Sequence, residues 1–250
     1  MNTKYLLSAI AAAALLAGCA GMATRALEVT PDIRAVVASP DRSEADRKTD
    51  ERRKPDMLLA FAGVRPGMKV LEVGAGAGYS AELLARSVGP QGVVYAHNSP
   101  DAIARFIKTR FDERAAKPVM NNVVKLIREF DDPIPADVRG LDLATMLYEY
   151  HDTPAAGINR AKMNRRIFEA LKPGGYFVVV DHAAKAGADA GVGKTLHRID
   201  EALVRREVEA AGFKFVASAD FLRNPEDPRE ATSSRATFRV DAFALKFVKP

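Results

Sequence analysis

Three glycines and one acidic residue form the stretch of this sequence with the clearest chemical potential. Gly74, Gly76 and Gly78 stand at alternate positions, and Glu72 comes two residues before the first of them. An apolar run of the strand type precedes the glycines, and a helical pattern begins at Ser80. A strand, a glycine turn and a helix bring backbone N–H groups toward a nucleotide-like ligand. A Cβ at the glycine positions would keep that ligand away.

The spacing of these glycines distinguishes two kinds of nucleotide-binding turn. The dinucleotide pattern G-x-G-x-x-G/A requires a small sixth residue, but Tyr79 stands there. The pattern G-x-G-x-G instead resembles motif I of the class I S-adenosylmethionine-dependent methyltransferases. The resemblance implies that the glycines pass close to the methionine part of the cofactor, with Ala75 and Tyr79 in the same turn. It also implies that Glu72 orients the turn or reaches the cofactor amine through water. The alternative is a turn that serves packing alone.

The elements that would position this turn alternate between strand and helix. The order, five strand–helix pairs followed by two strands, resembles the class I methyltransferase fold. That resemblance implies an α/β, Rossmann-like domain with a seven-stranded, mostly parallel sheet, an antiparallel last strand and helices on both faces. The turn at 171–176 also resembles the L-K-P-G-G turn of these enzymes. We expect strands at 70–73, 93–96, 123–127, 141–147, 176–180, 213–221 and 237–247, and helices from 80, at 100–116, at 158–171 and at 194–211.

The carboxyl ends of the second and third strands are where such a sheet would hold the adenosine part of the cofactor. The family places an acid at the second end to accept both ribose hydroxyls, and that register falls on His97, with Asn98 next. Neutral side chains give hydrogen bonds roughly half as strong as charged ones. At the third end, the resemblance implies that Glu129 accepts from the adenine amine and that Phe130 lies against the ring. An exposed loop carboxylate is the alternative for Glu129.

The end of the fourth strand would face the methyl acceptor. Tyr148 and His151 are the expected catalytic residues there. A neutral His151 would take a proton from an acceptor hydroxyl or amine, with Asp152 or Glu149 holding its tautomer. The competing interpretation is that His151 and Asp152 only cap the following loop.

No metal site is expected from the sequence. The acids of the fourth and fifth strand ends bind Mg²⁺ in some methyltransferases, and the corresponding residues are Glu149, Asp181 and His182. One imidazole among two carboxylates does not match the all-oxygen preference of Mg²⁺. His197 lies inside an expected helix with apolar neighbours, where a structural role is the simpler interpretation.

The first 19 residues have the features of a bacterial lipoprotein signal. Lys4 precedes an apolar stretch at 5–16, and the segment 16–19 matches a lipobox that ends at Cys19, the only cysteine. The resemblance implies lipidation of Cys19 and attachment to the periplasmic side of the envelope. The outer membrane is favoured because Ala20 is not the aspartate of an inner-membrane retention signal. A plain secretory signal is the alternative.

Three segments follow from this reading. They are the signal at 1–19, a tether and helical region at 20–54, and a methyltransferase-like domain at 55–250. Ser43 is the expected N-cap of a charged helix, and Pro55 opens the next helix. An exported chain with the ending 243–247 resembles a bacterial group called predicted secreted methyltransferases.

Composition permits several partners but selects none. The 250 residues carry a net charge of +5 and are 48% hydrophobic, which is ordinary for a chain with one substantial core. Basic residues are scattered, and no aromatic–basic interleaving indicates nucleic-acid binding.

The expected function is methyl transfer from S-adenosylmethionine to a small-molecule or envelope acceptor. Since the cofactor is made in the cytoplasm, a second hypothesis is a catalytically silent periplasmic binding module on the same fold. A nicotinamide-dependent oxidoreductase is disfavoured by the glycine spacing.

Overall fold

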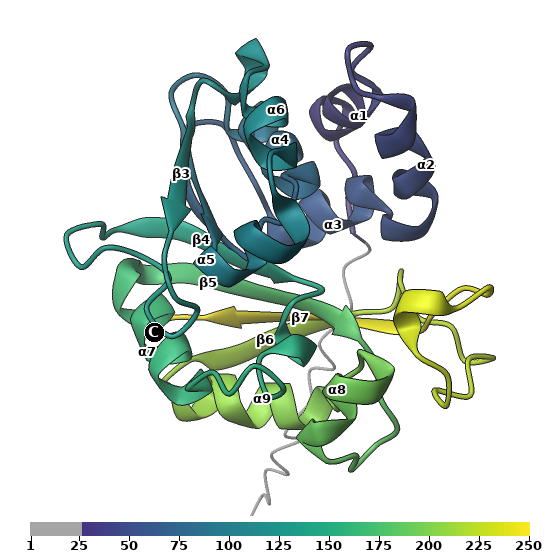
Figure 1. Cartoon of the computed structure of the whole chain (residues 1–250). Helices are drawn as coiled ribbons and strands as arrows, with labels where there is room; N and C mark the ends of the chain where they lie inside the picture. Colours follow the sequence, from purple (N-terminus) through teal and green to yellow (C-terminus); the bar gives the residue numbers. More distant parts are fainter. Residues whose placement is uncertain (1–26) are drawn as a thin grey trace, which may run out of the picture.

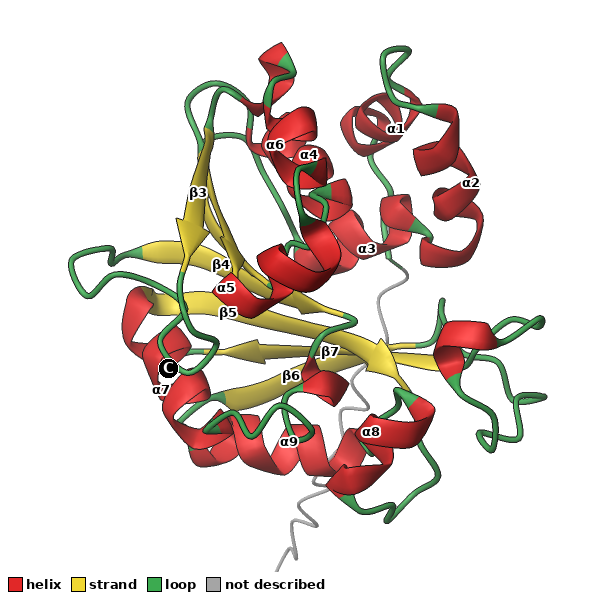
Figure 2. Ribbon diagram, in the orientation of Figure 1, coloured by secondary structure: helices red, strands yellow, loops and turns green. Residues whose placement is uncertain are grey.

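The computed structural model describes residues 27–250, so Cys19 and the expected signal lie outside the described residues. This part of the chain forms a seven-stranded sheet with helices on both faces (Figures 1 and 2). The strand order is β3-β2-β1-β4-β5-β7-β6, and β7 runs antiparallel to both of its neighbours while the other pairs are parallel. The expected fold class is therefore confirmed. The strands are Lys69–Val73 (β1), Val93–Asn98 (β2), Val123–Ile127 (β3), Leu141–Leu147 (β4), Leu171–His182 (β5), Lys214–Ala219 (β6) and Ala242–Val248 (β7).

The helices divide between the two faces of the sheet (Figure 2). Helices α3 to α6 lie on one face, and α7 and α9 lie on the other. The α-helices are Pro31–Ala38 (α1), Glu44–Arg53 (α2), Pro55–Ala62 (α3), Tyr79–Val88 (α4), Pro100–Ala102 (α5), Arg110–Ala115 (α6), Arg160–Ala170 (α7), Gly193–Leu196 (α8) and Glu201–Ala210 (α9). Short 3₁₀ or π turns are Ile103–Ile107 (η1), Pro118–Met120 (η2), Tyr150–Asp152 (η3), Ala190–Val192 (η4) and Ser233–Arg235 (η5).

Strand β1 shows why the sheet carries two cores. Its side chains alternate between the faces, with Val70 in the cluster beneath α3 and α4, and Leu71 and Val73 in the cluster beneath α7 and α9. All three side chains are fully buried, which is worth roughly 1.5–3 kcal/mol each. The same alternation turns Glu72 toward α4, and its chemistry follows from that position.

The N-terminal helices pack onto the sheet domain through ion pairs. Ser43 caps α2 as expected, since its hydroxyl accepts from the backbone N–H of Asp46. Arg114 of α6 binds the carboxylate of Asp46 at 2.7 Å and also donates to the carbonyl of Ala77 in the glycine turn. Helix α1, capped by Thr30, begins within the expected tether and helical region at 20–54. Helix α2 is thereby held against the glycine turn.

Two helices expected from periodicity are interrupted. The segment 100–116 is split by Lys108, and the segment 194–211 is split by His197; both residues have left-handed φ values, of 52° and 49°. Asp200 starts α9 by accepting from the N–H of Ala202, so a local cap competes with a continuous helix. Strand β5, expected at 176–180, extends from 171 to 182. The described part of the chain contains no helix of the length and apolarity that a membrane crossing requires.

Candidate functional site

The glycine turn has the backbone shape that its sequence predicts. Gly74 and Gly76 have φ values of 73° and 58°, where residues with a side chain are strained. A Cβ on Gly74 would lie 2.5 Å from Cγ of Glu149, whereas a Cβ on Gly76 would meet nothing within 4 Å. The turn is therefore closed by Glu149 on one side and open beside Gly76.

His97 and Asn98 stand at the end of β2, as expected, but their side chains bind the turn itself. The Nδ1 of His97 accepts from the N–H of Gly74 at 3.3 Å, and its Nε2 lies 2.9 Å from the carbonyl of Arg128. This arrangement requires a neutral ring with the proton on Nε2. Burial lowers the pKa of His97 to about 4, which agrees with a neutral ring. Asn98 bonds Gly76 twice, accepting from its N–H and donating to its carbonyl.

The expected ribose contacts of these two residues are thus replaced by contacts that shape the turn. Both ring nitrogens of His97 are engaged, so neither is free to bind a hydroxyl. Phe130 packs edge-on against the His97 ring at 5.0 Å, beside the place expected for adenine. Glu129 is exposed on the following loop. The structure therefore brings His97 and Asn98 close to Phe130, as expected, but the hydrogen bonds of His97 and Asn98 are made to protein backbone.

Glu72 is a buried carboxyl group with one free oxygen. It is 1% exposed; its Oε1 accepts from the hydroxyl of Ser80 in α4, and its Oε2 has no partner. Burial raises the pKa of Glu72 to about 7, although the Ser80 hydrogen bond and the charge of Arg53 oppose that shift. A buried unpaired carboxylate oxygen is costly, and a cationic or N–H-bearing ligand would relieve the cost.

Arg53, at the end of α2, places its guanidinium beside the aromatic rings that flank this turn. Its guanidinium lies 5.3 Å from the centre of the Tyr79 ring and 4.7 Å from that of Tyr148. The Nε atom of Arg53 is buried and has no hydrogen-bond partner. The hydroxyl of Tyr79 donates to Asp50 of the same helix at 2.6 Å. Tyr79 therefore docks α2 onto the turn, while Arg53 keeps a free donor above it.

Glu149 lies against Gly74 and follows Tyr148 at the end of β4. Burial, and then the negative charge of Asp152, raises the pKa of Glu149 to about 8. Tyr148 has a φ of 62°, which is an uncommon and strained conformation for a bulky residue. Its ring centre lies 4.8 Å from that of His182, with the two rings tilted by 44°. Burial raises the pKa of Tyr148 to about 12, so the phenol is neutral. Such strain at a strand end is typical of functional sites.

His151 is positioned by Asp181 and not by the residues expected from the sequence. Its Nδ1 lies 2.6 Å from Oδ1 of Asp181, and its backbone N–H donates to Oδ2 of the same carboxylate at 2.9 Å. Burial alone would lower the pKa of His151, but the negative charge and hydrogen bond of Asp181 outweigh it and raise the pKa to about 9. The expected tautomer holders, Glu149 and Asp152, do not make this contact. The hydrogen bonds of the His151 and Asp152 side chains run to Asp181 and His197, and not to the following loop.

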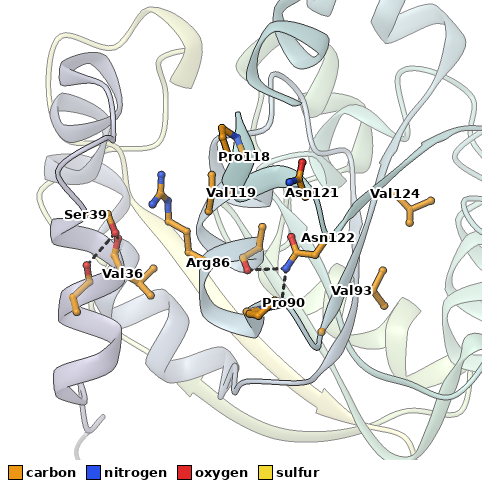
Figure 3. A pocket seen from close by; sticks show the side chains of 14 residues that line it. Val36, Ser39, Arg86, Pro90, Val93, Pro118, Val119, Asn121, Asn122 and Val124 are labelled. Carbon is orange, nitrogen blue, oxygen red and sulfur yellow. Dashed lines mark hydrogen bonds between the residues drawn. The ribbon is translucent and has the colours of Figure 1, made fainter. Parts of the chain in front are cut away.

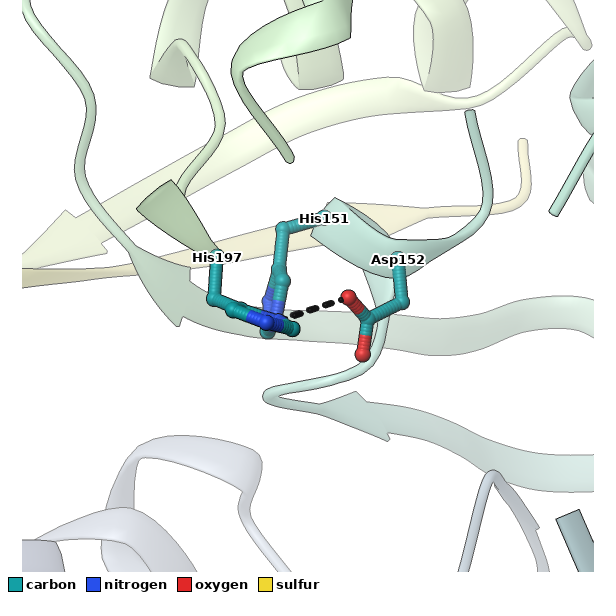
Figure 4. Close-up of side chains that lie close together, drawn as sticks. All are labelled: His151, Asp152 and His197. Atoms are coloured by element: carbon teal, nitrogen blue, oxygen red, sulfur yellow. Dashed lines mark hydrogen bonds and ion pairs between the residues drawn. The ribbon is translucent and has the colours of Figure 1, made fainter. Parts of the chain in front are cut away.

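His197 joins this group because α8 ends early. Its Nδ1 lies 3.0 Å from Oδ1 of Asp152, and the same oxygen lies 3.4 Å from Nε2 of His151 (Figure 4). His197 follows α8 in a left-handed conformation and its side chain is 40% exposed, so its expected place inside a helix is wrong. The Mg²⁺ candidates of the sequence do not form a compact group; of them, Asp181 is occupied by His151.

The sequence did not identify three functional residues of this site. They are Arg53, His197, and Asp181 as the partner of His151. Arg53 ends a charged helix, and nothing in the pattern distinguishes it from its exposed neighbours. Asp181 carried a usable signal, because it lies near the end of a buried strand that pairs with the strand preceding His151. The placement of His197 depended on recognising Asp200 as an N-cap.

A separate groove of about 770 Å³ lies at the amino ends of the strands (Figure 3). It is lined by Val36 and Ser39 of α1, by Arg86 of α4, and by the segments before β2 and β3. Parallel α/β sheets bind their ligands at the carboxyl ends of the strands, so this groove is on the wrong edge for the chemistry above. We place the candidate site at the glycine turn and the ends of β4 and β5.

Relatives of known activity match about half of the chain. A protein-L-isoaspartate O-methyltransferase of Methanosarcina mazei is 28% identical over 123 residues, which cover 49% of this chain and 44% of that protein. A ubiquinone/menaquinone biosynthesis C-methyltransferase of Idiomarina loihiensis is 25% identical over 127 residues, covering 51% and 47%. The chain thus spans about half the length of the curated relatives it matches.

Solved structures share the fold over most of the chain. A SAM-dependent methyltransferase from Aquifex aeolicus has a TM-score of 0.58 at 21% identity, covering 82% of this chain and 97% of that chain. The Aeropyrum pernix fibrillarin, solved with natively bound S-adenosylmethionine, has a TM-score of 0.51 at 16% identity, covering 74% and 68%. The family model described as a methyltransferase domain matches residues 65–212, more than half of the chain. The chain therefore belongs to the methyltransferase-domain family, and its fold is that of the class I S-adenosylmethionine-dependent methyltransferases.

Proposed function

We propose that this protein transfers a methyl group from S-adenosylmethionine to a small-molecule or envelope acceptor. The observation that carries the proposal is the pair of unpartnered polar atoms at the glycine turn, Oε2 of Glu72 and Nε of Arg53. The methionine end of the cofactor carries an ammonium and a carboxylate. Glu72 accepts from the first and Arg53 donates to the second, each in a charge-assisted hydrogen bond.

The residues present fit the methionine end of this cofactor better than its ribose. The buried carboxyl group of Glu72 and the half-buried one of Glu149 have raised pKa values and share one nearby guanidinium, that of Arg53, and so favour a ligand with net positive charge. The open space beside Gly76 leaves room at the turn. The ribose side offers no acid, so we expect weaker binding than in relatives that have one. Phe130 and Glu129 are the proposed contacts of the adenine.

The acceptor is proposed to enter at the ends of β4 and β5. When bound, S-adenosylmethionine supplies a methyl group that the sulfonium has already activated. The protein then has to align the acceptor and dispose of its proton. Tyr148 offers a neutral hydroxyl that orients the acceptor. His151, with Nδ1 held by Asp181, accepts the acceptor's proton on Nε2 when its ring is neutral, that is, above its raised pKa of about 9.

Calorimetry tests the cofactor and a transfer assay tests the reaction. The full-length protein in detergent is titrated with S-adenosylmethionine and with its demethylated product, and then incubated with the tritiated-methyl cofactor and envelope extracts. We expect binding of both ligands and protein-dependent incorporation of tritium. An absence of heat at millimolar ligand would refute both binding and transfer.

A catalytically silent binding module is the second candidate. It is favoured by one observation, the engagement of both ring nitrogens of His97 with the backbone where relatives place a ribose-binding acid. The two candidates differ in the same assays, since a silent module binds the ligand and incorporates no tritium.

We further propose that the protein acts on the periplasmic side of the envelope, anchored by a lipid on Cys19, at the outer membrane in preference to the inner one. The support is the lipobox at 16–19. The proposed partners are therefore a membrane surface and a small-molecule or envelope substrate, with no nucleic acid.

A further inference from the structure

Three of the chain's four histidines gather at the carboxyl ends of β4 and β5. His151, in η3, has its ring centre 5.9 Å from that of His182 and 5.5 Å from that of His197. They come from three separate segments, since His182 ends β5 and His197 follows α8. Asp152 lies between His151 and His197 (Figure 4).

The spacing of three of these ligand atoms suits a metal ion. Oδ1 of Asp152 lies 3.4 Å from Nε2 of His151 and 3.0 Å from Nδ1 of His197, and one ligand atom from each residue lies within 4.8 Å of the others. Zinc–ligand bonds of roughly 2.0–2.1 Å in a tetrahedron separate neighbouring ligands by about 3.3 Å. We propose that His151, Asp152 and His197 bind a divalent transition-metal ion, of which zinc is the type.

The support behind His151 is the kind that metal-binding histidines have. Its Nδ1 is bound by the fully buried carboxylate of Asp181, which fixes the ring and leaves Nε2 facing Asp152. A carboxylate behind a histidine strengthens the ring as a ligand and sets its tautomer. Asp181 is itself fixed by the backbone N–H groups of His151 and His182.

The backbone brings the two halves of this site together. The α-carbon of Gly193, which opens α8, faces η3 so closely that a Cβ there would lie 2.1 Å from the carbonyl oxygen of His151. The left-handed conformation of His197 then turns the chain at the end of α8. Half-exposed side chains on Asp152 and His197 leave the site open to ions from solvent.

The ligand set selects the class of ion. Two imidazoles and one carboxylate suit zinc and its neighbours, whereas Mg²⁺ and Ca²⁺ prefer oxygen ligands. Three protein ligands leave a coordination position open, as in catalytic and not in structural zinc sites. The ring of His182 connects this group to Tyr148, which contacts Arg53 at the glycine turn.

The open position defines the acceptor class, a consequence that rests on the proposed function. An acceptor hydroxyl or thiol bound to the ion breaks its O–H or S–H bond more easily; the proton leaves to solvent and the electron pair stays on the bound oxygen or sulfur. His151 then acts as a ligand in place of a proton acceptor. The ion site itself does not depend on the cofactor.

The test uses the full-length chain in detergent with Cys19→Ser, which removes the only thiol ligand. The protein is stripped with a chelator, freed of it, and titrated with Zn²⁺ by calorimetry and with Co²⁺ by visible absorption. We expect one ion per chain. Asp152→Asn and His197→Asn should each weaken binding by about 100-fold or more, and Asp181→Asn by about 10–100-fold. Asn is well tolerated at the left-handed position 197.

A matched control and a second readout keep the outcomes distinct. Asp220→Asn, which changes a carboxylate that is 91% exposed, should leave the affinity unchanged. Zinc should raise the melting temperature of the parent but not of His197→Asn. Lack of binding, or binding that Asp152→Asn and His197→Asn do not alter, overturns the metal site. S-adenosylmethionine is titrated separately without metal, so failure of the proposed function appears in that experiment alone.

Discussion

Glu72 connects the chemistry of the glycine turn to pH. Its pKa of about 7 is raised by burial, and a cationic partner at Oε2 would lower it, so ligand binding drives proton release below that value. We predict that the affinity for S-adenosylmethionine rises by up to about tenfold between about pH 6 and about pH 8. Calorimetry of Glu72→Gln should show a flatter profile, because the ligand's own amine titrates equally with both proteins. Parallel profiles would contradict the assignment.

His97 should make the folded state sensitive to acid. Its folded pKa of about 4 lies below the ordinary value of 6.5, so the unfolded chain binds a proton first as the pH falls. Stability is then full above about pH 6.5 and falls toward pH 4, by up to about 3 kcal/mol from this group. His97→Asn keeps an acceptor for Gly74 without titrating.

Urea unfolding of the two proteins at several pH values measures this term. Other titratable groups contribute equally to both proteins. The difference in free energy of unfolding between parent and His97→Asn should therefore become smaller as the pH falls from 6.5 to 4. A constant difference would show that His97 does not remain neutral in the folded state.

At the scale of elements, helix α2 is more than a solvated charged face. The sequence indicates its start at Ser43 correctly, because capping is local chemistry. The position of α2 against the glycine turn depends on tertiary contacts, such as those of Arg114 with Asp46 and Ala77. No local sequence pattern indicates these contacts.

The position of α2 leads to a prediction for Arg53. Replacing it by Ala removes the proposed donor to the cofactor carboxylate, and should weaken S-adenosylmethionine binding by about 10–100-fold, the range for a lost charge-assisted hydrogen bond. Lys48→Ala, on the exposed face of the same helix, is the control. Equal affinities of the two variants in calorimetry would remove α2 from the site.

The strands were easier to predict than the helices between them. The strands at 123–127 and 141–147 are confirmed with the predicted bounds, although only the second, which is central in the sheet, is buried on both faces. The helix predictions were wrong where one residue takes a positive φ, at Lys108 and at His197. The wrong helix at 194–211 had the larger effect on the predicted site, because His197 reaches Asp152 only through the turn after α8.

At the scale of the whole molecule, the seven-stranded sheet with an antiparallel last strand was predictable because it follows from the family resemblance. The partners of buried polar groups were not, since Asp181 and His151 are 30 residues apart and meet only when β4 and β5 pair. The anchor remains a prediction of the sequence.

The anchor predicts where the protein is found in cell fractions. Cys19→Ser should move the protein from the membrane pellet to the soluble periplasmic fraction, because a lipid chain contributes about 0.8 kcal/mol per buried CH₂ to membrane affinity. Immunoblots of the fractions, with radiolabelled palmitate to detect the lipid, measure this. A Cys19→Ser protein that still pellets with membranes and a parent without label would exclude the anchor.

The close contact at Gly193 means that the absence of a side chain there sets the distance between α8 and η3. A single methyl group there would act as a wedge between η3 and α8, because the atom it meets is main-chain oxygen and has no rotamer to change. Gly193→Ala should cost about 1–3 kcal/mol in thermal unfolding, as overpacking does, and should widen the gap between His151 and His197 without altering either ring. If that variant loses the Co²⁺ absorption but keeps its affinity for S-adenosylmethionine at Glu72, the backbone spacing at Gly193 sets the distance between the proposed metal ligands.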